Sequence, residues 1–79
     1  MFLHINEAQY IDNYSLKLKF NNNEIKQVDL KNELYGEVFE PLKDKDFFKD
    51  FFISHNTIEW KNGADFAPEF LYEISQDIK

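Results

Sequence analysis

The segment from residue 14 to residue 20 alternates strictly between apolar and polar side chains. Its inward set is Tyr14, Leu16, Leu18 and Phe20, and its outward set is Ser15, Lys17 and Lys19. Because successive side chains of a strand point to opposite faces, this pattern predicts a strand with one face on a core and the other in water. The rest of the chain must therefore supply partner strands and a layer that covers the apolar face.

Two neighbouring segments supply those partner strands. Residues 21–23 are three asparagines, which tolerate the left-handed conformation of tight hairpin turns, so residues 24–30 are expected to run back beside the first strand. Residues 3–11 alternate as well, but the phase slips and predicts a bulge near residues 6–7. These segments together predict a three-stranded antiparallel meander.

Helical spacing follows the meander. Residues 31–35 are expected to form a short helical turn ended by Gly36, the residue type that most often takes the left-handed position after a helix. Four phenylalanines then recur with helical spacing, and Asp44 or Asp46 offers that helix an N-cap. They are Phe47, Phe48, Phe51 and Phe52.

A second hairpin is predicted next. Residues 52–55 and 57–60 have the composition of two short strands around a turn at residues 55–56. A length of 79 residues leaves no room for a second core. The sequence thus predicts one α+β domain over residues 1–79, with a three-stranded antiparallel meander, a short helix, a second hairpin and a C-terminal helix packed on the sheet.

The C-terminal helix is predicted over residues 68–78. Pro68 suits its first position, which makes Ala67 the N-cap and lets Phe66 staple onto Leu71. Its apolar stripe consists of Phe70, Leu71, Ile74 and Ile78. Tyr72 is predicted to project from the opposite side, either as an ordinary exposed ring or as an anchor of an interface.

Acidic residues recur every four positions along this helix, at Asp65, Glu69, Glu73 and Asp77. Like charges at this spacing destabilise a helix by about 0.2–0.5 kcal/mol per pair. Asp77 also lies near the negative end of the helix dipole. The row is interpreted either as a solvated face or as an acidic surface for a basic partner protein.

Composition limits the classes of function. The formal net charge is −6, with nine lysines and no arginine, whereas phosphate backbones are bound by clustered basic residues. The charge therefore argues against nucleic-acid binding. Without cysteine the chain has neither a disulfide framework nor a thiolate metal site. No signal peptide and no membrane-spanning apolar run is recognisable, so a cytoplasmic protein is expected.

Aromatic residues are abundant for so short a chain. Phe, Tyr and Trp make up 18% of it. A core of this size is not expected to enclose every ring, and an exposed apolar patch usually marks an interface. This surplus points to contact with another protein or with a second copy of the chain.

No catalytic site, metal site or cofactor is predicted. The chain has two histidines, His4 and His55, the residue type most used for proton transfer, but Ser54 is expected on the opposite strand face from its neighbour His55. The acidic residues between 44 and 50 lack the glycine and the alternating oxygen ligands of a calcium loop. Helix capping explains them.

The segment 59–71 holds the only tryptophan beside an Asn-Gly turn. Asp65 lies too early to cap the last helix. Its carboxylate is expected to accept N–H groups of residues 62–64 or to face something outside. The alternative hypothesis for function places Trp60, Asn62 and Asp65 around the pocket of a small-ligand-binding domain or minor enzyme.

The same segment resembles the closing motif of a small bacterial family, domain of unknown function 2442. In that motif a tryptophan precedes an Asn-Gly-Ala-Asp turn and a Leu-Tyr dipeptide, here Trp60, residues 62–65 and residues 71–72. Residues 36–44 resemble the family's central motif, residues 14–20 its second strand and residues 28–30 the end of its third. Lys61 stands where a proline is common, and Asn23 where a glycine often ends the first hairpin.

The resemblance implies an α+β fold without an established activity. Some members carry a helix-turn-helix domain after this one, which suggests regulation, but no such extension is expected after Lys79 and DNA binding is not carried over. Short members often lie beside another small gene, an arrangement that looks like a toxin–antitoxin pair or a mobile-element cassette.

The leading hypothesis is a non-enzymatic protein-interaction or regulatory module, one half of such a gene pair, that binds a protein partner or itself. Its candidate interaction or pocket residues are Trp60, Asn62, Asp65, Glu69, Tyr72 and Glu73.

Overall fold

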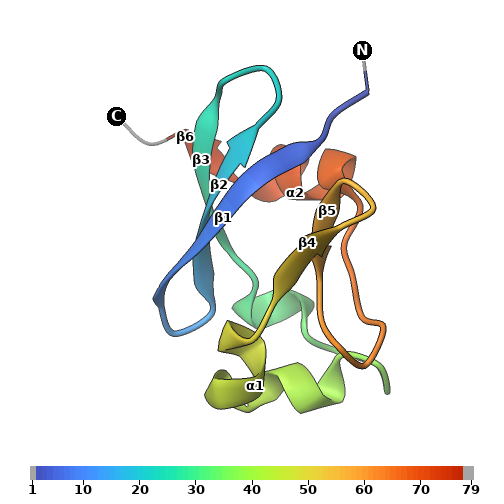
Figure 1. Ribbon diagram of the computed structural model, residues 1–79. Coiled ribbons are helices and arrows are strands. Elements are labelled where there is room, and N and C mark those ends of the chain that lie inside the picture. Colours follow the sequence, from blue (N-terminus) through green and yellow to red (C-terminus); the bar gives the residue numbers. More distant parts are fainter. Residues whose placement is uncertain (1, 78–79) are drawn as a thin grey trace.

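The structure of the chain, a computed structural model, describes residues 2–77. Its main sheet has four antiparallel strands in the order β1-β2-β3-β6, and β4 and β5 form a separate hairpin (Figure 1). The strands are β1 (Ile5–Asp12), β2 (Ser15–Phe20), β3 (Ile25–Asp29), β4 (Phe52–Ser54), β5 (Thr57–Glu59) and β6 (Gln76–Asp77). The helices are the 3₁₀ turns η1 (Lys31–Glu33) and η2 (Glu40–Lys43) and the α-helices α1 (Lys45–Lys49) and α2 (Pro68–Ile74). The predicted α+β class is confirmed.

The layers of the fold enclose one core. α2 lies across one face of the sheet, the hairpin β4-β5 stands beside β1, and α1 and η2 close the end opposite α2 (Figure 1). Side chains from all of these elements form one buried cluster. None of the helices in the described part of the chain has the length and apolar character of a membrane span.

The register of β1 against β2 contains the predicted bulge. It shifts between Ile5 and Glu7, and it shifts again between Tyr10 and Asp12. A bulge bends its strand and increases the local twist, so both ends of β1 depart from the regular ladder. The second irregularity was not predicted.

The inward face of β2 lies at the centre of the core. Leu16, Leu18 and Phe20 are fully buried, as the alternation predicts. Ser15, predicted on the wet face, is buried too. It is a small residue on a central strand and pairs with both Asp12 of β1 and Asp29 of β3, so larger neighbours shield it from water.

The α-helix α1 begins as predicted and ends early. Its N-cap Asp44 accepts a hydrogen bond from the backbone N–H of Asp46 at 3.0 Å. The N–H of Asp50 then donates to a carbonyl three residues back, which closes the helix with a tight turn. The helical interpretation of Phe51 and Phe52 is therefore wrong, and Phe52 starts β4 instead.

Gly36 begins a turn and does not end one. η1 stops at Glu33, whereas the carbonyl of Gly36 accepts hydrogen bonds from the N–H groups of Phe39 and Glu40 at 3.1 Å each. Gly36 has φ +91°, a conformation that glycine adopts without the steric cost of a side chain. Its role is to direct the chain into η2.

The helix α2 starts where the sequence predicts and is shorter. Ala67 is its N-cap and Pro68 its first residue. It ends at Ile74, not at residue 78, because Ser75 is extended and the chain then pairs with β3 as β6. This pairing supplies partners for backbone groups at the edge of β3. Ile78, part of the predicted stripe, lies outside the described residues.

Candidate functional site

Trp60, the first of the predicted site residues, belongs to the core. Its side chain is fully buried, and its indole N–H donates to the carbonyl of Phe48 at 2.8 Å. The rings of Phe48, Phe51 and Phe66 lie around it, with centroid separations of 5.6, 6.4 and 6.0 Å. A fully buried side chain has no surface to offer to a ligand, so the pocket hypothesis loses this residue.

Asn62 holds two segments together. Its Oδ1 accepts a hydrogen bond from the N–H of Ala64 at 3.2 Å, and its Nδ2 donates to the carbonyl of Val38 at 2.9 Å. Gly63 has φ +91°, as a tight turn at this point requires. The turn that was predicted to bond to Asp65 is thus closed by Asn62.

Asp65 takes part in the fold through its backbone. It forms an isolated antiparallel bridge with Glu59 at the end of β5. Its side chain is exposed. Within residues 2–77 no hydrogen bond or ion pair engages its carboxylate, which therefore faces water.

A row of three phenylalanine rings joins the loop before η2 to α2. Phe39 stacks on Phe66 at 4.8 Å between centroids, and Phe66 stacks on Phe70 at 5.9 Å. Phe66 and Leu71 both lie in the buried core, as the staple prediction requires. The residue of α2 whose ring stacks on Phe66 is Phe70. The chain between β5 and α2 runs beside the segment that leads into η2 (Figure 1).

Two exposed apolar side chains lie on the loop that carries Phe39, the first ring of this row. Tyr35 is 71% exposed and Val38 is 44% exposed. Tyr35, Val38 and the half-buried Phe39 and Phe70 are together named the apolar patch. Exposed patches of apolar side chains on a soluble domain often mark interaction sites. The sequence pattern did not single out Tyr35 or Val38, because they lie in an aperiodic loop.

A profile of the family described as "Protein of unknown function (DUF2442)" matches residues 5–77. The chain belongs to the DUF2442 family. No curated protein and no solved structure matches it. In this DUF2442 domain the side chain of Asn62 and the stack of Phe39 on Phe66 join residues 36–44 to residues 60–72 and hold the two segments in place.

Tyr72 of the DUF2442 domain faces the sheet, which corrects the prediction that it projects outward. Its ring packs edge-on against Phe20 at 5.2 Å, and its hydroxyl donates to the carboxylate of Glu24. The Lys26 ammonium lies 3.8 Å from the ring centroid and donates to the Tyr72 carbonyl at 3.3 Å. Because α2 is short and packs on β3, this side of the helix is half-buried.

The hydrogen bond between Tyr72 and Glu24 shifts two pKa values in opposite directions. Together with a bond from Asn22 Nδ2 at 2.7 Å, it lowers the pKa of the Glu24 carboxyl below its ordinary value of 4.5. The same bond to a carboxylate raises the pKa of the Tyr72 hydroxyl above its ordinary value of 10.0. The pair therefore favours the state with Glu24 ionised and Tyr72 protonated.

Replacing Tyr72 with phenylalanine should give a loss of stability that depends on pH. Since the pKa of Glu24 is lowered by folding, its contribution is complete above about pH 4.5 and is lost as pH falls through the folded-state value. Since the pKa of Tyr72 is raised, its contribution is complete below about pH 10 and is lost as pH rises through the folded-state value. Urea unfolding of wild type and Tyr72→Phe across this range should show the largest difference near neutrality.

Tyr10→Phe is the matched control for this pH dependence. The Tyr10 hydroxyl donates to the Asn13 carbonyl at 3.0 Å, a neutral acceptor, so its deletion should cost the same in weak acid as at neutral pH. A Tyr72→Phe difference that stays constant down to about pH 3 would show that Glu24 is not the partner that matters.

The acidic row on α2 is shorter than predicted. Asp77 lies in β6, where its carboxylate is 3.7 Å from the Lys26 ammonium. Glu69 and Glu73 remain, one turn apart on the exposed side of the helix. They leave the outer face of α2 acidic beside Phe70.

The turn of the second hairpin brings Ser54 and His55 together, which corrects the prediction that they face apart. Ser54 Oγ lies 3.0 Å from His55 Nδ1, and a Glu59 carboxylate oxygen lies 3.4 Å from that same nitrogen. A catalytic triad requires the base to bridge nucleophile and carboxylate through its two different nitrogens. The His55 side chain is also 85% exposed, so this group is a surface cluster.

The acidic residues near α1 have structural partners. Asp44 caps the helix, and Asp50 lies 3.6 Å from the Lys61 ammonium. No three His, Cys, Asp or Glu side chains within residues 2–77 are grouped to hold a metal ion.

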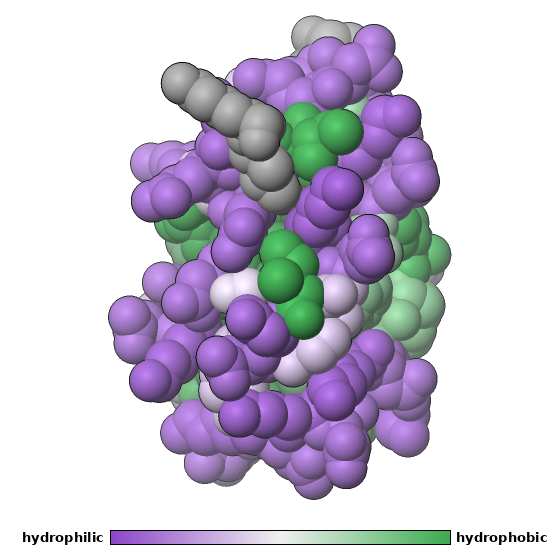
Figure 2. Space-filling model, turned by 90° about the vertical axis from the view of Figure 1, so that its left-hand side faces the viewer, coloured by the Kyte–Doolittle hydropathy of each residue, from purple (hydrophilic) through white to green (hydrophobic). Residues whose placement is uncertain are grey.

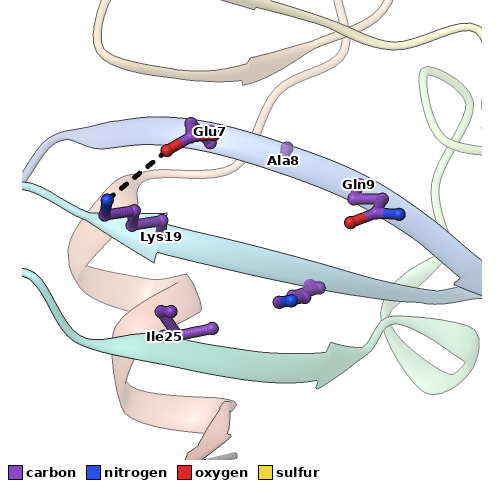
Figure 3. A pocket seen from close by; sticks show the side chains of 6 residues that line it. Glu7, Ala8, Gln9, Lys19 and Ile25 are labelled. Atoms are coloured by element: carbon purple, nitrogen blue, oxygen red, sulfur yellow. Dashed lines mark ion pairs between the residues drawn. The ribbon is translucent and has the colours of Figure 1, made fainter.

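The uncovered face of the main sheet has a hollow of about 390 Å³. It is lined by side chains from β1, β2 and β3, and the ion pair between Lys19 and Glu7, at 3.6 Å, crosses it (Figure 3). The side of the molecule where β3 and β6 lie is mainly hydrophilic, with apolar side chains in separate small areas (Figure 2).

Proposed function

We propose that this DUF2442 domain is a non-enzymatic protein-interaction module that binds its partner through the apolar patch. The observation that carries the proposal is the exposure of Tyr35 and Val38, 71% and 44%, on the loop that leads to Phe39 and its stack on Phe66. Covering such groups removes apolar surface from water, which contributes about 25 cal/mol per Å² to association. A partner that covers them gains affinity at a site whose shape already exists.

The resemblance of the chain to short family members points to a first partner to test. Because such members often lie beside another small gene, we propose that the product of the adjacent gene is the partner, in a toxin–antitoxin-like or mobile-cassette pair. The lack of cysteine supports a reducing compartment, and we place the interaction in the cytoplasm.

Co-expression with the adjacent gene product tests the proposal. The two proteins should co-elute on size exclusion, with a complex mass by light scattering. Replacing Tyr35 and Val38 together with serine should weaken the complex by at least about tenfold, since about 1.4 kcal/mol of lost apolar burial suffices for that change. Ile25→Ser is the control, because Ile25 is 38% exposed on the uncovered sheet face.

A complex that tolerates the double serine variant but is lost with Ile25→Ser would place binding on the sheet face and refute the apolar patch. A domain that forms neither a complex nor an oligomer would refute the interaction module itself.

A further inference from the structure

We infer that the partner meets the apolar patch with a basic segment, in which lysine or arginine side chains flank apolar ones. The inference rests on the proposed interaction function and adds the chemistry of the partner to it. The apolar patch makes the contact, and the charges that border it select what binds.

The apolar patch is fixed in one shape before any partner binds. The bond from Asn62 Nδ2 to the Val38 carbonyl ties the loop to the chain after β5. The stack of Phe39 on Phe66 ties the end of the same loop to the start of α2. A surface held by such contacts loses little conformational freedom on binding, so more of the apolar gain appears as affinity.

All charged residues in the two segments that border the apolar patch are acidic. Residues 33–40 and 62–73 contain no lysine. Their carboxylates belong to Glu33, Glu37, Glu40, Asp65, Glu69 and Glu73. Among these, within the described part of the chain, only Glu40 forms an ion pair, with Lys43 at 3.2 Å.

Two lysines elsewhere in the domain lie beside carboxylates. Lys19 lies 3.6 Å from Glu7 on the sheet, and Lys26 lies 3.7 Å from Asp77 beside α2. The two segments that border the apolar patch therefore carry a local excess of negative charge. Such a field attracts a positively charged partner, raises its association rate and disfavours an acidic one.

The same charges argue against two other occupants. A second copy that binds through a two-fold axis would place this surface against itself and bring like charges together. A nucleic acid would bring phosphates to a surface whose two bordering segments, residues 33–40 and 62–73, contain no lysine or arginine. A basic protein segment is the occupant that satisfies both the apolar and the charged parts.

Two fluorescein-labelled peptides of equal length test this inference by fluorescence anisotropy. One alternates lysine with leucine and phenylalanine, and the other has glutamate in place of each lysine. The domain should bind the basic peptide at least about tenfold more tightly than the acidic one. Raising NaCl from about 50 mM to about 500 mM should weaken the basic complex, because exposed charges are screened.

Two matched double variants show which carboxylates are responsible for the preference for the basic peptide. Glu37→Lys with Glu69→Lys should weaken binding of the basic peptide by about tenfold, whereas Glu7→Lys with Asp12→Lys on β1, with the same change in net charge, should alter it by less than about twofold. Equal losses in the two double variants would reveal general attraction to an acidic protein and would overturn the inference.

The remaining outcomes separate this inference from the proposed function. If both peptides bind equally and Tyr35→Ser with Val38→Ser weakens both, the apolar patch is an interaction site without charge selection, and only the inference fails. A dimer in sedimentation velocity that this double serine variant disrupts would make a second copy the occupant and would also refute the inference. Binding of neither peptide overturns the inference, while the adjacent gene product still decides the proposed function.

Discussion

Replacing Trp60 with alanine should lower the free energy of unfolding by about 3–5 kcal/mol. The change deletes the largest fully buried side chain and leaves a cavity among the rings of Phe48, Phe51 and Phe66. It also removes the N–H that bonds the buried Phe48 carbonyl. Natural domains have a free energy of unfolding of about 0.05–0.15 kcal/mol per residue. For a domain of this length the expected loss is a large part of the total, so much of the variant should be unfolded at 25 °C. Far-UV circular dichroism during urea unfolding measures the loss without relying on tryptophan fluorescence.

Trp60→Phe keeps the prediction measurable if the alanine variant does not fold. Phenylalanine retains an aromatic ring but cannot donate to the Phe48 carbonyl, and an unpaired buried acceptor costs about 1–3 kcal/mol. Tyr35→Ala is the control, because a side chain that is 71% exposed should cost less than about 0.5 kcal/mol. Equal losses for Trp60→Ala and Tyr35→Ala would mean that Trp60 is not a core residue, and would return it to the pocket hypothesis.

The parts of the fold that could be predicted are those where residue type and local geometry agree. The alternation of residues 14–20 fits one strand face, and Asp44 has both the position and the side chain of an N-cap. The ends of helices could not be predicted in this way. α2 stops at Ile74 because β3 offers a free edge to the next residues, a contact between segments far apart in the sequence.

The same limit of sequence-based prediction applies to single residues of the candidate site. Asn62 and Asp65 both carry an oxygen that can accept the N–H groups of the turn, so the sequence does not decide between them. The structure selects Asn62, whose Nδ2 also donates to the Val38 carbonyl, as no carboxylate could. Tyr72 was assigned outward from its place on the helix alone. Its actual partners, Glu24 and Lys26, lie around β3 and are distant in sequence.

Replacing Phe48 with alanine should destabilise the domain about as strongly as replacing Trp60, by about 3–5 kcal/mol. Phe48 is fully buried, and its ring lies 5.3 Å from that of Tyr14 and 6.3 Å from that of Tyr10. It is the buried residue of the five-residue helix α1, so its side chain fixes that helix to the sheet. Thermal unfolding followed by circular dichroism should show a melting temperature lower by well over about 10 °C, at about 4–8 °C per kcal/mol.

Phe47→Ala is the matched control, since Phe47 is the neighbour of Phe48 on the same helix, has the same side chain and is only half-buried. Helix propensity changes equally in the two variants, so the difference between them isolates core packing. Phe48→Leu combined with Trp60→Phe then measures the coupling of the two rings, which lie 5.6 Å apart. Contacting residues are expected to deviate from additivity by about 0.5–3 kcal/mol, and strictly additive losses would show that α1 and the Trp60 segment are stabilised independently.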